Sequence, residues 1–173
     1  GCFMNSSNAN STLKIDFPSS LRRIEKRAFA NGAIAELIIP ENLEYIGEEA
    51  FASVNSGQTK LNKIDFNGNT KITEIKPRTF YGCSGLRSVT LGAEVKVVGE
   101  SAFESCQNNL TTLVCNDKLE RIEQSAFRYC NGFQNGSVRF NSGLKYIGHF
   151  AFGSTNLRNK QIPRGTQCES DAF

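Results

Sequence analysis

Apolar residues recur along this chain in a frame of about 24 residues. Seven phenylalanines mark the frame, because each follows an Ala or Thr in the same local context and successive members lie 21 to 29 residues apart. A period of this length is typical of repeat proteins, in which each copy stacks on the copy before it. The marker residues are Phe29, Phe51, Phe80, Phe103, Phe127, Phe152 and Phe173.

The first half of each copy predicts a short β-strand. In the third copy, Ile64 and Phe66 alternate with Asp65, which places two apolar side chains on one face and a polar one on the other. In four copies the strand is followed by a residue that extends a strand poorly: Pro18, Pro40, Gly92 and Pro163.

The second half of each copy predicts a tight corner followed by a single helical or 3₁₀ turn. Its apolar residues lie three, then four or five positions apart, which suits one turn but not a long helix. Gly47, Gly99 and Gly148 each follow a β-branched residue at this corner, where we expect an unusual φ or a close approach of two backbones.

One copy of about 24 residues cannot bury its apolar side chains alone. Stacked copies can, because each strand then lies beside the previous one in a parallel sheet and the phenylalanines stack inside. We therefore predict one repeat domain of about seven copies over residues 12–173, with one parallel sheet of six or seven short strands and little helix.

The full frame, L-x-x-[IV]-x-[LIF]-P-x-x-L-x-x-I-G-x-x-A-F-x-x-C, resembles the BspA-like class of leucine-rich repeats, which are common in bacterial cell-surface proteins. The segments IIPENLEYIGEEAF (38–51) and GLRSVTLGAEVKVVGESAFESC (85–106) fit it almost position for position. The resemblance implies an α/β fold: a right-handed leucine-rich-repeat solenoid with a parallel sheet on the concave face and short turns or 3₁₀ helix on the convex face. The third copy and the loops around 52–60 and 131–136 are longer than the pattern.

Composition is compatible with one folded domain. The chain has 173 residues, of which 39% are hydrophobic and 21% charged, with a formal net charge of +3. The small, scattered positive excess is unlike a nucleic-acid-binding surface, so we expect no nucleic-acid partner. We also expect no membrane span, because no apolar run is long enough, and no signal peptide, because no charged and then apolar segment opens the chain.

Five of the six cysteines fall at core positions of the repeat. Three of them follow the marker phenylalanine by three residues, one holds a strand position and one a corner position, so we expect all five to be buried and reduced: Cys83, Cys106, Cys130, Cys115 and Cys168. Their spacing of about 24 residues, without a C-x-x-C pair, is unlike that of structural zinc ligands.

The two ends of the chain leave alternatives open. Residues 1–11 are either a tether behind a lipid-modified Cys2, the one route we expect to a membrane, or the remnant of a preceding repeat. The frame runs to Phe173 with no polar cap, so we expect a longer array or a covering neighbour there. The alternative is that the degenerate seventh copy is itself a minimal cap.

No motif in the chain predicts catalysis, a cofactor or a metal. His149 is the single histidine, and it occupies a variable polar corner slot that Glu48, Glu100 and Gln124 fill in other copies. Neither the P-loop nor the dinucleotide-binding glycine pattern occurs. We therefore expect a protein that is not an enzyme.

The strand side chains that point away from the core are the candidate protein-binding face, because solenoids commonly bind through such a surface. Alternation assigns its first column to Lys14, Glu36, Lys63, Ser88, Thr112, Ser137 and Asn159. The second column is Asp16, Ile38, Asp65, Thr90, Val114, Arg139 and Gln161. Neither column contains the tyrosine or tryptophan anchors that often dominate interfaces.

Two functions are compatible with these features. The resemblance implies a non-catalytic recognition module, at the cell surface or secreted, that binds a protein partner such as a host or matrix protein by adhesion through the exposed strand face. The alternative is a structural spacer or accessory segment of a larger surface protein, with no ligand of its own. A contiguous apolar patch on the face favours recognition, and a uniformly polar face favours the spacer. The oligomeric state stays open.

Overall fold

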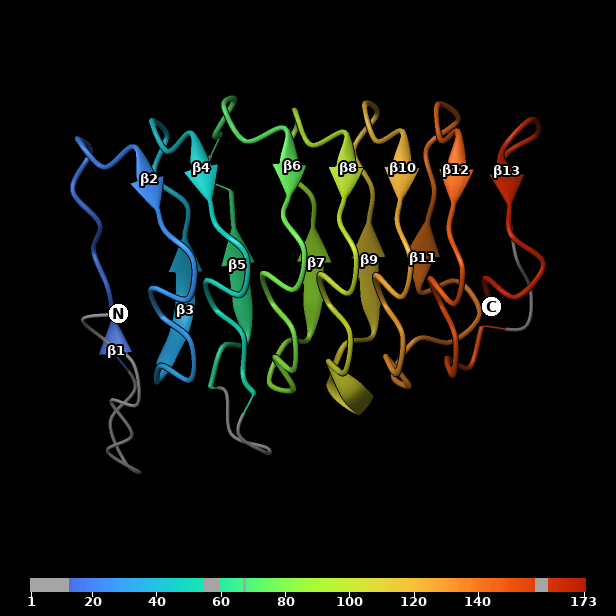
Figure 1. The fold of residues 1–173 in the computed structure, drawn as a ribbon, viewed down its shortest axis with the longest axis horizontal. Helices are drawn as coiled ribbons and strands as arrows, with labels where there is room; N and C mark the ends of the chain where they lie inside the picture. Colours follow the sequence, from blue (N-terminus) through green and yellow to red (C-terminus); the bar gives the residue numbers. More distant parts are fainter. Residues whose placement is uncertain (1–12, 55–59, 67, 158–161) are drawn as a thin grey trace.

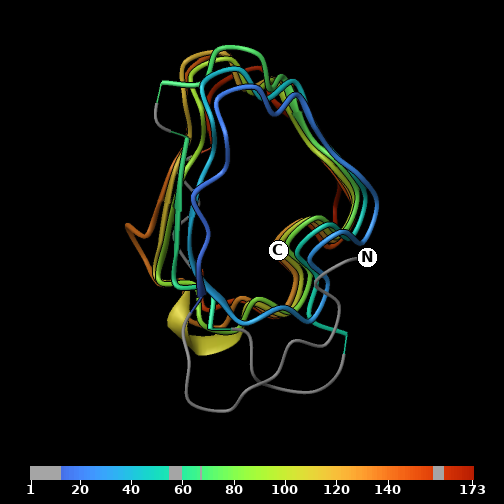
Figure 2. The same ribbon diagram turned by 90° about the vertical axis from the view of Figure 1, so that its left-hand side faces the viewer.

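The computed structural model describes residues 13–54, 60–66, 68–157 and 162–173. Each copy of the sequence repeat forms one rung of a solenoid, and the rungs follow one another in a row from the first copy to the last (Figure 1). Viewed along this row, successive rungs superimpose on one closed outline (Figure 2). The 24-residue frame therefore corresponds to one structural unit.

The predicted strands form a six-stranded parallel sheet in the order β1-β3-β5-β7-β9-β11. The first six copies contribute one strand each, and neighbouring strands come from consecutive copies, as the alternation and the period predict. The strands are β1 (Leu13–Lys14), β3 (Ile34–Ile38), β5 (Lys63–Asp65), β7 (Ser88–Thr90), β9 (Thr112–Val114) and β11 (Val138–Arg139). The right-handed sense and the concave position of this sheet stay predictions.

The expectation of a single sheet is wrong, because the corner segment of each rung is also extended and pairs with its neighbours. One further sheet has the order β13-β12-β10-β8-β6, and β2 pairs with β4. We call these seven strands together the second ladder: β2 (Arg23–Ile24), β4 (Tyr45–Ile46), β6 (Glu74–Ile75), β8 (Val97–Val98), β10 (Arg121–Ile122), β12 (Tyr146–Ile147) and β13 (Gln167–Cys168).

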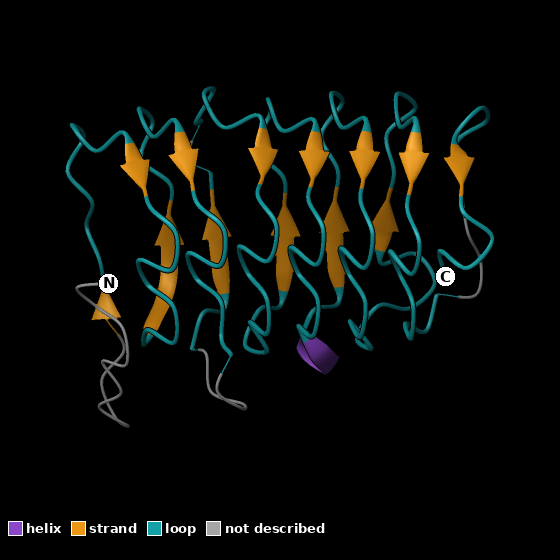
Figure 3. Cartoon of the chain, viewed as in Figure 1, coloured by secondary structure: helices purple, strands orange, loops and turns teal. Residues whose placement is uncertain are grey.

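Hydrogen bonds between rungs explain the second ladder. The N–H of Gly47 donates to the carbonyl of Ile24 at 2.8 Å, and the N–H of Gly99 donates to that of Ile75 at the same distance. Tight turns follow each of these strands, where a helical turn was expected. Within the described ranges the one helix is the three-residue 3₁₀ helix η1 (Gln107–Asn109), so the prediction of little helix is confirmed (Figure 3).

The marker phenylalanines form the predicted internal stack. Successive rings from Phe29 to Phe173 have centroids 5.1 to 5.6 Å apart and planes within 16° of parallel. Phe80, Phe103, Phe127 and Phe152 have no exposed surface, while Phe173 is half-buried against Phe152. The stack belongs to one continuous core that also contains the inward-facing residues of both ladders.

Three buried or half-buried asparagines join successive rungs. Each follows the strand that its rung contributes to the six-stranded sheet. Asn69 is 1% exposed, and its Nδ2 donates to the carbonyls of Pro40 at 2.7 Å and Leu43 at 2.8 Å in the preceding rung. Asn116 and Asn141 make the same kind of bond to the rungs before them. Asparagine thus satisfies backbone carbonyls at the position where Pro18, Pro40 and Pro163 stand in other copies.

The corner glycines are required by a close approach of two backbones. A Cβ at Gly99 would lie 2.6 Å from the carbonyl oxygen of Ile75, and one at Gly47 would lie 2.6 Å from the amide nitrogen of Lys26. Gly148 is similarly close to Gln124 at 2.8 Å. Of the two reasons predicted for these glycines, the close approach is therefore the one that applies.

The cysteine prediction is confirmed for three positions. Cys83, Cys106 and Cys130 are reduced and buried, and each Sγ donates to the carbonyl of a phenylalanine in the preceding rung. Cys115 and Cys168 are reduced but only partly buried, so their predicted full burial is wrong. Cys115 lies beyond the end of β9, and Cys168 belongs to the last strand of the second ladder, which pairs with β12 alone.

Candidate protein-binding face

The exposed side of the six-stranded sheet brings the first predicted column into register. Glu36 pairs with Lys63, Lys63 with Ser88, and Ser88 with Thr112 across consecutive rungs. All four side chains are exposed, because they alternate with core residues along their strands. Ser137 is half-buried and comes directly before β11.

The second column also follows the strand register. Ile38 pairs with Asp65, Thr90 with Val114, and Val114 with Arg139. Thr90 and Arg139 are exposed, whereas Asp65 and Val114 are half-buried. The structure therefore places these side chains on one surface, as the alternation predicts.

Four predicted face residues lie at the ends of the sheet or outside the described residues. Lys14 pairs with Glu36 through β1, but its side chain is outside the described residues. Asp16 is exposed and lies beyond the end of β1. Asn159 and Gln161 are outside the described residues, as are Cys2 and the rest of segment 1–11.

Charge and polarity change along this face. The first rungs carry Glu36, Lys63 and Asp65, and Lys63 forms an exposed ion pair with Asp65 at 3.4 Å. The middle rungs carry hydroxyl side chains from Ser88, Thr90 and Thr112. Ile38 is 37% exposed, and it is the exposed large apolar side chain among the described residues of the two columns.

The sheet opens locally between β5 and β7. One residue pair, Lys63 with Ser88, joins β5 to β7, whereas three pairs join β7 to β9. The opening is a groove of about 450 Å³ whose lining includes Asp65, Phe66, Ser88, Thr90 and Gly92. It coincides with the third copy, where the sequence is longer than the repeat pattern.

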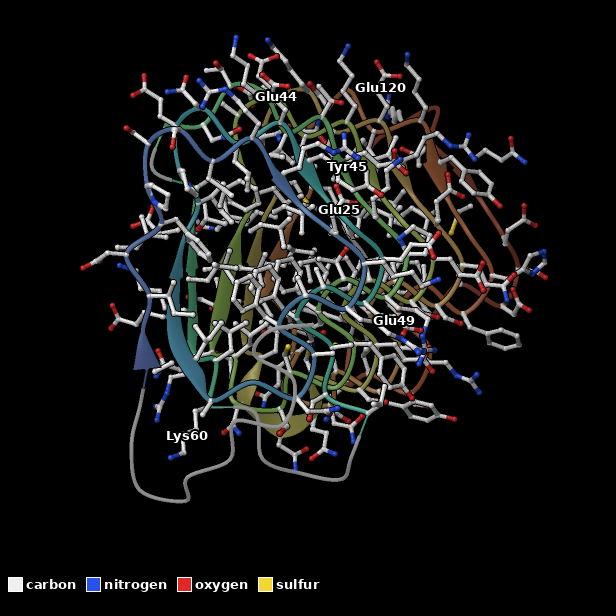
Figure 4. The ribbon with its side chains drawn as sticks, turned by 60° about the vertical axis from the view of Figure 1, so that its left-hand side comes forward. Glu25, Glu44, Tyr45, Glu49, Lys60 and Glu120 are labelled. Carbon is white, nitrogen blue, oxygen red and sulfur yellow. The ribbon has the colours of Figure 1, made fainter. Side chains whose placement is uncertain are left out.

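Aromatic residues lie instead on the second ladder, where the sequence pattern predicts no binding surface. The guanidinium of Arg23 lies 4.1 Å from the ring centroid of Tyr45, and that of Arg121 lies 4.3 Å from Tyr146. Figure 4 shows Tyr45 on this side of the solenoid. Tyr45 and Tyr146 each precede the buried isoleucine of a Y-I-G triplet, which was the available sequence signal.

Carboxylates surround the second of these tyrosines. The Tyr146 hydroxyl donates to Glu169 at 3.3 Å, while Glu123 pairs with Arg121 at 2.6 Å. Partial burial, followed by the negative charge of Glu169, raises the pKa of Tyr146. Tyr146 is therefore joined to the next rung by its hydroxyl and stacks on an arginine of the preceding rung.

His149 occupies the exposed position that the sequence predicts. Its side chain is 52% exposed, with Nδ1 2.8 Å from Asp171 and Nε2 3.7 Å from Glu169 in the last rung. In the part of the chain that the structure describes, no three His, Cys, Asp or Glu side chains gather to hold a metal ion. No helix within the same ranges is long and apolar enough to cross a membrane.

Comparison with protein families identifies the repeat. The model of the BspA type leucine rich repeat region, which contains six copies, matches residues 1–108 and 56–173. The two matches together extend over the whole chain. The protein therefore belongs to the BspA-type leucine-rich repeat family. Comparison with curated proteins gives no match.

Solved bacterial structures share the fold. A leucine rich cell surface protein from Faecalibacterium prausnitzii is 26% identical with a TM-score of 0.62, over 72% of this chain and 31% of the other. The leucine-rich repeat protein of T. pallidum, TpLRR, is 24% identical with a TM-score of 0.71, over 85% and 66%. The pneumococcal vaccine antigen PcpA is 22% identical with a TM-score of 0.68, over 83% and 36%.

The chain is shorter than these relatives. It spans about a third of the F. prausnitzii protein and of PcpA, and just under two thirds of TpLRR. At 24% and 22% identity, TpLRR and PcpA show the fold alone.

Proposed function

We propose that this chain is a non-catalytic recognition module at a bacterial cell surface, and that it binds a protein partner through the exposed face of the six-stranded sheet. Membership of the BspA-type family supports this role, as does the similarity to a leucine rich cell surface protein. A host or matrix protein is the partner class that we propose, with adhesion as the result of binding.

The observation that carries the proposal is the register of the two exposed columns. Six strands at a spacing of about 4.8 Å place their side chains in rows that extend over about 24 Å. The strand backbones are already hydrogen-bonded within the sheet, so a partner meets an ordered surface that costs little conformational entropy to bind. A surface of this length suits a protein better than a small molecule.

Two features of the face supply specific contacts. Ile38 offers an exposed apolar side chain beside the charged pair of Lys63 and Asp65. The groove between β5 and β7 lies next to that pair and is lined partly by the apolar ring of Phe66. An apolar contact flanked by charges gives both binding energy and orientation.

The alternative is a spacer that displays other parts of a larger protein. The observation that favours it is the polar character of the middle rungs, where Ser88, Thr90 and Thr112 offer no large apolar anchor. In this case the face has no ligand, and the repeats contribute length alone.

A capture experiment distinguishes the recognition module from the spacer. The immobilised chain is incubated with extracellular-matrix and serum proteins, and bound proteins are identified by mass spectrometry. A face variant combines Ile38→Lys, Thr90→Lys and Val114→Lys. A control variant adds the same charge to exposed positions on or beside the second ladder through Thr73→Lys, Gln124→Lys and Gln167→Lys.

Recognition through the strand face predicts a protein that is captured by the native chain and by the control variant but not by the face variant. Equal capture by all three chains contradicts the proposed face. A native chain that captures no protein supports the spacer.

A further inference from the structure

Two exposed aromatic side chains lie together at the corner that follows the second ladder. Tyr129 is 40% exposed and Phe150 is 42% exposed, and both rank among the large exposed apolar residues of the described chain. Tyr129 follows β10 and Phe150 follows β12, so the two residues come from adjacent rungs. Neither belongs to the six-stranded sheet or to its candidate face.

Arg128 joins these two rings. Its guanidinium carbon lies 4.6 Å from the ring centroid of Tyr129 and 5.1 Å from that of Phe150. The Nε atom of Arg128 is buried and has no hydrogen-bond partner, and no ion pair of Arg128 occurs among the described residues. The guanidinium therefore lies close to two rings, and no carboxylate in the described ranges pairs with it.

The fold itself does not need aromatic residues at these positions. Ser101 and Ser125 occupy the corner position of Phe150 in the two preceding rungs, with the same left-handed backbone, φ 52° and 55° against 52°. The equivalents of Tyr129 are Ser105 and Ser154, with φ 62° and 58°.

Bulky residues are unfavourable in this backbone region. Phe150 and Tyr129, with φ of 52° and 60°, thus add strain at positions where serine serves in neighbouring rungs. Their rings lie outside the phenylalanine stack and are exposed to solvent. Core packing therefore does not account for them.

We propose that Arg128, Tyr129 and Phe150 form a second docking surface, and that it binds an acidic segment of a partner protein. A carboxylate of that segment accepts hydrogen bonds from the Arg128 guanidinium, while an adjacent apolar side chain packs on the two rings. The charge of Arg128 is complementary to this segment, and arginine and aromatic residues are enriched in the parts of protein interfaces that contribute most to affinity.

This inference rests on the proposed role as a protein-recognition module but uses a different surface. The test begins with phage-displayed random 12-residue peptides selected on the full native chain. Enriched sequences are synthesised with their acidic residues and, separately, with the corresponding amides. Their dissociation constants are then measured by fluorescence anisotropy.

Three variants accompany the selection. Arg128→Gln removes the charge. Tyr129→Ser combined with Phe150→Ser installs the residues of the neighbouring rungs, and a urea midpoint at or above that of the native chain shows that this variant is folded. The matched control is Arg121→Gln, because Arg121 also stacks on a tyrosine but is paired with Glu123 at 2.6 Å.

The proposal predicts enriched peptides in which Asp or Glu adjoins an aromatic or aliphatic residue. Arg128→Gln, the double serine variant and the amide peptides each weaken binding by about tenfold or more, as expected for an interface hot spot. Arg121→Gln and the strand-face variant leave the affinity unchanged, so this result is independent of the strand face.

Several results overturn the proposal. One is the absence of enriched peptides, and another is equal binding of the enriched peptides to Arg128→Gln and to the native chain. A third is binding of hyaluronan oligosaccharides at this surface with no peptide binding, which identifies an anionic-glycan site instead.

Discussion

Phe103 and Phe127 lie one above the other in the core, with ring centroids 5.1 Å apart and planes only 2° from parallel. This distance is close to the spacing of about 4.8 Å between neighbouring strands of a sheet. The ring stack and the backbone ladders therefore repeat with the same step. Each marker phenylalanine from Phe51 to Phe152 stacks on the rings of the rungs on both sides, which couples the stability of neighbouring copies.

Truncation of the central ring tests this coupling. Phe103 has no exposed surface, so Phe103→Ala is expected to lower the free energy of unfolding by about 3–5 kcal/mol. Urea denaturation measures the change. Val54→Ala, at a position that is 48% exposed, is the control and is expected to change stability by less than about 0.5 kcal/mol. A loss below about 1 kcal/mol for Phe103→Ala would mean that the stack contributes little.

The inter-rung asparagine bonds predict a second large effect. Asn69→Ala removes the donor to the Pro40 and Leu43 carbonyls and the Oδ1 acceptor of the Ile72 N–H at 2.9 Å. Buried groups left without partners should cost about 3 kcal/mol in total.

Asn42→Ala is the matched control for Asn69→Ala. Asn42 makes one long bond of 3.4 Å to the Ser19 carbonyl at the surface, and its loss should cost less than about 0.5 kcal/mol. Equal effects of the two substitutions in urea denaturation would show that the bonds of Asn69 are not stabilising.

Thiol reactivity tests the cysteine environments. Burial raises the pKa of the Cys115 thiol to about 12, and it raises the pKa of Cys106 well above the ordinary value. Because the thiolate is the reactive form, we expect slow modification of Cys115 at pH 8, even though it is only partly buried. The rate should rise about tenfold with each pH unit.

The measurement uses a Cys2→Ser, Cys168→Ser background and a maleimide reagent, with mass spectrometry of the labelled protein. In urea, the four remaining cysteines should react at once. Rapid labelling of Cys83, Cys106 and Cys130 in the folded protein would argue against their core assignment.

Acid stability should depend on Glu49. Its carboxylate is paired with Arg27 and with Arg78 at 3.1 Å, and its side chain is 13% exposed. The hydrogen bond from Arg27, aided by the charges of Arg27 and Arg78, lowers the pKa of Glu49 against an opposing effect of burial.

A carboxyl whose pKa is lower in the folded state stabilises the fold above its unfolded pKa of about 4.3, and this contribution is lost as the pH falls through the folded pKa. The difference in unfolding free energy between the native chain and Glu49→Gln should therefore be large at pH 7 and shrink toward pH 3. Urea denaturation across this range measures it. A difference that is constant with pH would contradict the ion pairs.

Local sequence patterns were sufficient to predict the strands of the six-stranded sheet and their parallel stacking. The alternation of Ile64, Asp65 and Phe66 is visible within one copy, and the period places the next copy beside it. The second ladder was missed because a two-residue strand such as Tyr45–Ile46 is too short to show alternation. Its stability comes from inter-rung bonds such as that from Gly47 to Ile24, which no single copy reveals.

The candidate face could also be predicted only in part from the sequence. The exposure of Glu36, Ser88 and Thr112 follows from period-two alternation. The groove between β5 and β7 depends on how the longer third copy packs between two regular copies. The extra residues of that copy are visible in the sequence, but their packing is not. The contact of Arg128 with Phe150 needs the alignment of two rungs, and the aromatic residue at a position that is otherwise polar was its one sequence signal.

The affinity of a captured partner for the strand face tests the central claim most directly. Biolayer interferometry gives the dissociation constant of that partner for the native chain, the face variant (Ile38→Lys, Thr90→Lys, Val114→Lys) and the control variant (Thr73→Lys, Gln124→Lys, Gln167→Lys). Recognition through the six-stranded sheet predicts that the face variant binds at least about tenfold more weakly, while the control variant stays within about twofold of the native chain. Equal affinities of the face variant and the native chain would contradict the proposed function of this face.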